Sequence, residues 1–160
     1  MRHGEAGGRS AIPAKDAERS LTVAGRREME EIGESLLTMG LKFDAVLASP
    51  LKRTYETAAI VSKIFKSLDR LEQSDELKPE GKRSDLYKKL ARLKADSSIL
   101  IVGHEPYLST MIGEMVSGSS NSHIMLKKGG LAKVRATSFL PKPSGELRWL
   151  LTPKQIRKLS

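Results

Sequence analysis

The feature that most constrains the fold of this chain is a repeated change of pattern. A short apolar run ends abruptly, and apolar residues then recur at the spacing of a helix. Residues 98–102, Ser-Ile-Leu-Ile-Val, are the clearest buried-strand pattern, and residues 103–106, Gly-His-Glu-Pro, end it. Pro106 is predicted to start a helix, because apolar residues then recur at positions 108, 111, 112, 115 and 116. His104 therefore lies between the end of a strand and the beginning of a helix.

A second junction of the same kind follows residues 44–48, Asp-Ala-Val-Leu-Ala. Ser49 is the predicted N-cap of the next helix and Pro50 its first residue, which places Arg53 in the first turn. In open α/β sheets ligands bind beyond the carboxyl ends of the strands, where helix N-termini favour anions. The two junctions together predict an anion site that contains Arg53 and His104.

The remaining patterns extend this alternation of strand and helix along the chain. We expect a helix over residues 23–39, an uncertain region at 71–77, a helix near 85–94, strands at 131–136 and 147–151 joined as a hairpin, and a short tail helix. The order predicts a three-layer α/β/α sandwich with a mixed, mainly parallel sheet. With 160 residues and no linker or repeat, residues 1–160 are predicted to form a single domain.

Residues 2–5, Arg-His-Gly-Glu, would lie beside the other two junctions if a strand ended at His3. Only Met1 and Arg2 precede it, which is too short for an ordinary strand. The first strand is therefore expected to be truncated or missing: either the recorded chain starts late, or the sheet lacks a strand.

These segments resemble the histidine phosphatase superfamily (phosphoglycerate mutase-like), and more closely its SixA-type phosphohistidine phosphatases. The resemblance rests on motifs in a fixed order: Arg2-His3-Gly4-Glu5-Ala6, Leu21-Thr22 with Gly25, Ala48-Ser49-Pro50-Leu51 with Arg53 and Thr57-Ala58, Val102-Gly103-His104-Glu105-Pro106, Lys128-Gly129-Gly130-Leu131-Ala132, and Leu150-Leu151-Thr152-Pro153. It implies a phosphoglycerate mutase-like fold and a phosphatase that needs no metal and no cofactor.

The resemblance also implies roles for individual residues. His3 would be the nucleophile that becomes phosphorylated, and Arg2, Arg53 and His104 would hold the phosphoryl oxygens. Arg19 matches a further arginine that often reaches this pocket in the SixA-type proteins. Glu5 is interpreted as a carboxylate that supports the loop or pairs with a pocket arginine at least as readily as it is interpreted as a catalytic residue.

Phosphoryl transfer explains why such residues would gather. The transferred group spreads negative charge over three oxygens, which the planar fork of arginine binds well. His3 must attack as neutral imidazole, so nearby arginines are expected to lower its pKa, whereas bound phosphate should raise the pKa of His104. The enzyme would form phospho-His3 and then hydrolyse it with water.

The proton donor is the weakest part of the pattern. An ester leaving group needs a general acid, and only Asp75 and Glu76 are candidates, neither within a convincing motif. A phosphorylated imidazole leaves more easily, which favours phosphohistidine on a protein as the substrate and a place in signal transduction. The alternatives are a small phosphate ester, such as a sugar or nucleoside phosphate, and a phosphate-binding module without turnover.

Composition excludes several other classes of protein. The chain has no cysteine and its three histidines are scattered, so no metal site is expected. No apolar run is long enough for a membrane span and no signal-peptide pattern occurs, so we expect a cytoplasmic protein. The net charge of +9 suits phosphorylated partners, but short basic pairs with few aromatics predict no specific nucleic-acid binding. His123 is expected to be solvent-exposed and outside the site.

Overall fold

The computed structural model describes residues 1–121 and 123–159, and it is a mixed α/β structure with a mainly parallel sheet, as predicted. The helices and strands are α1 (Pro13–Ala17), α2 (Val23–Thr38), β1 (Ala45–Ala48), α3 (Lys52–Ile64), η1 (Leu68–Arg70), β2 (Leu71–Gln73), η2 (Asp75–Leu77), α4 (Arg83–Leu90), β3 (Ile99–Val102), α5 (Tyr107–Ser117), β4 (Leu131–Ser138), β5 (Ser144–Leu151) and α6 (Pro153–Ile156).

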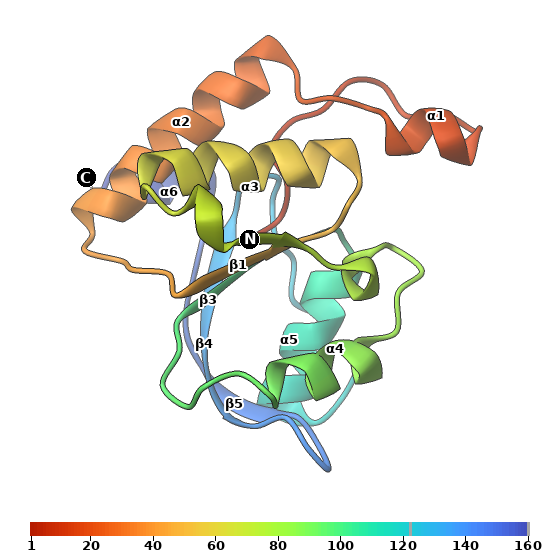
Figure 1. Ribbon diagram of the computed structural model, residues 1–160, viewed down its shortest axis with the longest axis vertical. Helices are drawn as coiled ribbons and strands as arrows, with labels where there is room; N and C mark the ends of the chain where they lie inside the picture. The colour runs from red at the N-terminus through yellow and green to blue at the C-terminus, as the bar shows by residue number, and fades with distance from the viewer. Residues whose placement is uncertain (122, 160) are drawn as a thin grey trace.

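The strands form two hydrogen-bonded groups. β2, β1 and β3 are parallel neighbours in that order, and β4 and β5 form the expected antiparallel hairpin. Helices α2, α3 and α6 lie on one side of the strands, and α4 and α5 lie on the other (Figure 1). One buried apolar cluster fills each interface between the layers. Because β1 and β3 are covered on both faces, their short sequences are entirely apolar, whereas the edge strand β2 contains Glu72 and Gln73.

Residues 1–3 lie between the two groups of strands. Arg2 forms a parallel bridge with Gly103, and its backbone N–H donates to the Gly130 carbonyl oxygen at 3.0 Å. The short run that precedes His3 is thus paired on both sides, although only a single bridge is formed. This pairing places His3 at the carboxyl end of β3.

Several sequence predictions need correction. Ser49 is not an N-cap: α3 begins at Lys52 after the N-cap Leu51, and Ser49 is fully buried. The region from 71 to 77 contains an edge strand, β2, and a single 3₁₀ turn, which are too short to give a periodic pattern. The short helix α1 was not expected from the sequence, and α4 ends at Leu90 rather than near Lys94.

Candidate active site

The backbone around His3 is held by two other parts of the chain. The His3 N–H donates to the Gly103 carbonyl at 3.1 Å, and the Gly129 N–H donates to the carbonyls of Arg2 and His3. Gly129 has a φ of +71°, a conformation that favours glycine over other residues. The Gly129–Gly130 turn therefore fixes the segment that carries His3.

The ring of His3 is oriented for attack through one of its nitrogens. Nδ1 lies 2.8 Å from the carbonyl oxygen of Gly4, so this nitrogen carries the hydrogen and the neutral ring has its lone pair on Nε2. Burial lowers the pKa of His3 to about 4; the Gly4 carbonyl opposes this shift, and the charges of Arg53, Arg2 and Arg19 add to it. The direction is the one expected from the sequence, but desolvation is the main cause.

His104 lies opposite His3, with ring centroids 5.5 Å apart. Its Nε2 is 2.9 Å from the Ser49 hydroxyl, and its buried Nδ1 has no hydrogen-bond partner among the described residues. Burial and the charge of Arg53 lower the pKa of His104 to about 3. When the Ser49 hydroxyl donates to Nε2, Nδ1 carries a hydrogen and can donate to an oxyanion. Ser49, which sequence reasoning assigned to a helix cap, is thus the partner of His104.

The charges of three arginines act on His3, and Asp16 connects two of these arginines. Arg53 is 4% exposed; its Nη1 donates to the Asp16 backbone carbonyl at 2.9 Å and its Nη2 lies 3.4 Å from the carboxylate. Arg19 Nε is 3.2 Å from the other carboxylate oxygen of Asp16. The Nη1 of Arg2 donates to the Leu126 carbonyl at 2.9 Å. The buried Nε atoms of Arg2 and Arg53 have no partner within the described part of the chain.

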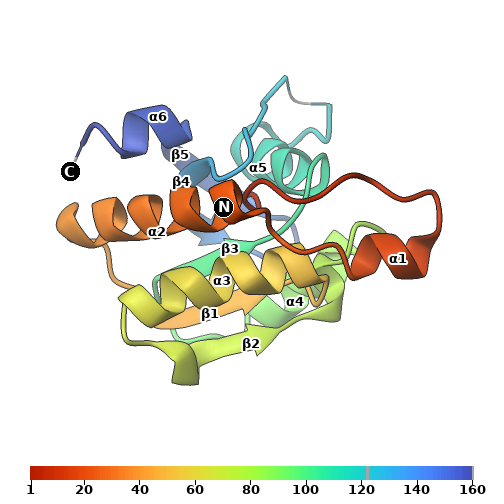
Figure 2. The same cartoon turned by 90° about the horizontal axis from the view of Figure 1, so that it is seen from above.

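The sequence analysis missed Asp16 altogether. The residue is carried by α1, which lies beyond the N-terminal end of α3 (Figure 2). Its carboxylate accepts from the Ser10 N–H and interacts with Arg19 and Arg53, and these contacts lower its pKa. The only signal in the sequence was its spacing of three residues from Arg19, which is common on helices and carries little information alone.

Other motif residues support the wall of the site from behind. The Gly4 N–H donates to the Thr57 hydroxyl at 3.0 Å, which ties the His3 segment to α3. The Thr22 N–H donates to the Glu5 carbonyl, and a Cβ on Gly25 would collide with this same carbonyl. The Glu5 carboxylate binds Lys128 Nζ at 2.8 Å rather than a pocket arginine.

The two candidate proton donors interact with neighbouring side chains. Asp75 is exposed and pairs with Lys78 at 2.7 Å. Glu76 accepts a hydrogen bond from the Ser74 hydroxyl, which lowers its pKa, and its carboxylate is 4.0 Å from Lys89 Nζ. Within residues 1–121 and 123–159, no hydrogen bond or ion pair joins either carboxylate to His3, and Glu76 is held in its ionised form. A general acid would have to be protonated.

Two further findings concern residues outside the pocket. His123 is exposed, as predicted. The described residues contain no group of three potential metal ligands, and none of their helices has both the length and the hydropathy that crossing a bilayer requires.

Comparisons with known proteins agree with this geometry. Residues 1–79 match the family model described as histidine phosphatase superfamily (branch 1). A protein from Picosynechococcus sp., described only as uncharacterized, is 31% identical over 166 residues, which cover 96% of this chain and 94% of that protein. The chain belongs to the histidine phosphatase superfamily.

Solved structures of other superfamily proteins share the fold. The protein histidine phosphatase SixA complexed with tungstate has a TM-score of 0.82 and 25% identity, with 96% of this chain and 95% of that chain covered. A putative alpha-ribazole-5'-P phosphatase from Escherichia coli has a TM-score of 0.69 and 20% identity, with 96% and 95% covered. The likeness to SixA confirms that this member of the histidine phosphatase superfamily is SixA-like.

Proposed function

We propose that this protein is a metal-independent phosphatase that forms phospho-His3 and removes phosphate from phosphohistidine on a partner protein. The observation that carries the proposal is the orientation of His3: Nδ1 donates to the Gly4 carbonyl, which leaves the lone pair on Nε2 free in a buried ring beside three arginines. In this mechanism, Nε2 attacks phosphorus and the substrate imidazole leaves. Water then hydrolyses the phosphorus–nitrogen bond of phospho-His3.

The surrounding residues supply the charge that this reaction needs. Arg2, Arg53, Arg19 and His104 would bind the phosphoryl oxygens, since fixed cations and donors stabilise the charge of the transferring group. SixA, with which this chain shares 25% identity, was solved with tungstate, a tetrahedral oxyanion that resembles phosphate in shape and charge. An oxyanion ligand in this similar protein supports a role for the arginines of this chain in binding a phosphoryl group.

The choice of phosphohistidine over an ester rests on the leaving group. The carboxylates of Asp75 and Glu76 interact with Lys78, Ser74 and Lys89, and Glu76 is ionised. An alkoxide leaves poorly without a proton donor, whereas imidazole is a better leaving group. A phosphatase for small esters remains the second candidate, because the alpha-ribazole-5'-P phosphatase has the same fold.

A trapping experiment tests the proposal. Incubation of the protein with a phosphohistidine peptide, followed by rapid denaturation in alkali, should show a covalent phosphoenzyme that is stable in alkali and labile in acid. His3→Ala should form none. His123→Ala is the matched control, since His123 is exposed, and it should form as much phosphoenzyme as the parent protein.

The same assay separates the alternatives. Turnover of small phosphate esters without turnover of the peptide would contradict the proposed substrate but keep the phospho-His3 mechanism. Binding of phosphate with no phosphoenzyme from either substrate would contradict catalysis and favour the binding module.

A further inference from the structure

A fourth arginine, Arg9, is held beside the candidate site by the residues on either side of it. The Gly7 carbonyl accepts a hydrogen bond from Arg19 Nη1 at 2.9 Å, and the Ser10 N–H donates to the Asp16 carboxylate at 3.3 Å. Both Arg19 and Asp16 belong to the site described above. Arg9 therefore lies in a short stretch of chain that is tied to the site on both sides.

The charge of Arg9 reaches the buried arginines. Burial lowers the pKa of the Arg53 guanidinium, and the charges of Arg19 and Arg9 lower it further, whereas the Asp16 carboxylate opposes them. Arg9 is exposed, whereas Arg53 is 4% exposed. An anion that binds Arg9 would therefore lie outside the buried phosphoryl site. It would be a second anionic group of the same substrate.

The guanidinium of Arg9 forms no ion pair within residues 1–121 and 123–159. Asp16 is shared by two arginines of the site, and Glu5 binds Lys128. Glu18 lies in the same segment and is exposed, but it is not paired with Arg9. The planar fork of a guanidinium matches the two oxygens of a carboxylate. Arg9 is thus available to a carboxylate of another molecule.

Helix α1 adds two exposed side chains to this surface. Each residue of α1 is at least partly exposed, and the helix projects at one end of the molecule, beyond α3 (Figure 2). Ile12, immediately before α1, is 52% exposed, and Lys15 is exposed and forms no ion pair with a described residue. Protein interfaces combine apolar contacts with charge complementarity. An apolar side chain between two available cations therefore suits an acidic protein surface better than a small phosphate ester.

We propose that Arg9, Ile12 and Lys15 form a docking site for the partner protein whose phosphohistidine this enzyme hydrolyses. Arg9 binds an aspartate or glutamate beside the phosphohistidine, Ile12 contacts an apolar side chain, and Lys15 adds a second positive charge. Charge complementarity of this kind speeds association and selects among partners. The inference rests on the proposed function and adds the chemistry of the partner, which is an acidic surface around the phosphorylated histidine.

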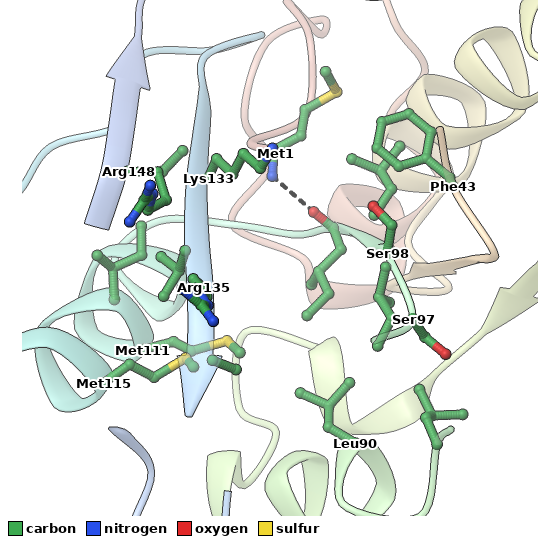
Figure 3. A pocket seen from close by; sticks show the side chains of 18 of the residues that line it. Met1, Phe43, Leu90, Ser97, Ser98, Met111, Met115, Lys133, Arg135 and Arg148 are labelled. Carbon is green, nitrogen blue, oxygen red and sulfur yellow. Dashed lines mark hydrogen bonds between the residues drawn. The ribbon is translucent and has the colours of Figure 1, made fainter. Parts of the chain in front are cut away.

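Arg135 provides a matched control on another face of the molecule. Like Arg9, it is an exposed arginine that forms no ion pair in the described part of the chain. It lines a separate cavity of about 1150 Å³, and the lining of that cavity includes neither histidine of the candidate site nor any of its arginines. Figure 3 shows Arg135 on β4, at the hairpin side of this cavity. Arg135→Gln therefore changes the net charge as Arg9→Gln does, but leaves the docking site intact.

The test compares two phosphohistidine peptides of equal length, one with glutamates on both sides of the phosphohistidine and one with glutamines. The parent protein and Arg135→Gln should prefer the acidic peptide in kcat/KM by about fivefold or more, and Arg9→Gln by about twofold or less. High salt should weaken the preference. In Arg9→Glu, a peptide with lysines at the same positions should gain on the acidic peptide by about tenfold relative to the parent, which a purely structural role of Arg9 would not produce.

The outcomes separate the docking site from the proposed function. Equal turnover of the acidic and neutral peptides by the parent protein would overturn the docking site and leave the phosphatase standing, as would equal effects of Arg9→Gln and Arg135→Gln. Absence of a phosphoenzyme from every peptide would instead contradict the proposed function.

A sugar bisphosphate and the matching monophosphate test the other source of a second anion. If Arg9→Gln loses a preference for the bisphosphate while its peptide preference stays that of the parent, the docking of an acidic protein is overturned. Arg9 would then recognise a small ester.

Discussion

Asp16 is predicted to compete with the phosphoryl group for the arginines of the pocket. Its carboxylate is 3.4 Å from Arg53 Nη2 and 3.2 Å from Arg19 Nε, so it neutralises charge that an oxyanion would otherwise use. In Asp16→Asn this competing charge is removed. The backbone carbonyl that accepts from Arg53 at 2.9 Å remains, so Arg53 should keep its place.

The size of the effect follows from Coulomb's law. Two unit charges about 4 Å apart interact with about 4 kcal/mol at an effective dielectric constant of 20. The Asp16 side chain is 25% exposed, and we discount this figure to about 1–2 kcal/mol for solvent screening. Asp16→Asn should therefore bind orthovanadate about 5–30 times more tightly.

Competitive inhibition by orthovanadate, or calorimetry with the same anion, measures this change. Asp85→Asn is the matched control: it alters the net charge equally, but Asp85 pairs with Lys88 on the surface of α4. Unchanged or weaker vanadate binding in Asp16→Asn alone would refute the reasoning and show that the carboxylate orients the arginines rather than competing with the ligand.

Three further predictions concern the histidines and their support. Ser49→Ala removes the hydrogen bond to His104 Nε2 and should lower kcat/KM about tenfold, whereas Ser62→Ala, whose buried hydroxyl has no partner among the described residues, should not. Gly25→Ala should lower the free energy of unfolding by about 1–3 kcal/mol in urea titrations because its Cβ meets the Glu5 carbonyl; Gly8→Ala, with open space around it, should change little. The pKa of His3 is about 4 in the folded protein and about 6.5 in the unfolded chain, so the unfolded state binds more protons between these pH values. The contribution of His3 to the free energy of unfolding should therefore fall by about 3 kcal/mol as the pH is lowered from 6.5 to 4. In urea titrations across this pH range, His3→Asn should lack this part of the decrease.

The sequence predicted the elements that have strong periodicity or a pure apolar core. The buried run of β3 and the amphipathic helix α2 were located within one or two residues. β2 was missed because three residues on a sheet edge, two of them exposed, carry no alternating pattern that can be recognised. Patterns within a short stretch of sequence therefore predicted the buried strand and the amphipathic helix. They did not predict a strand that forms only because it pairs with a distant part of the chain.

Some residues of the candidate site could likewise be predicted from short stretches of sequence, and others could not. The positions of Arg53 and His104 followed from the rule that strand ends meet at one edge of a sheet, and the structure brings both close to His3. The partnership of Ser49 with His104 spans 55 residues and could not be read from either segment. Asp16 was hidden for a similar reason, since its interaction with Arg53 spans 37 residues.

The segment between Glu5 and Thr22 has a consequence for how substrate choice can change. It is closed at its base by the Thr22–Glu5 hydrogen bond and the pairing of Ala6 with Leu21, while its outer part carries Asp16 to the arginines. Loops tolerate insertion and replacement better than the strands and helices that they connect. An exchange of this segment between relatives would thus alter what the enzyme recognises while the strands and helices behind it kept their packing.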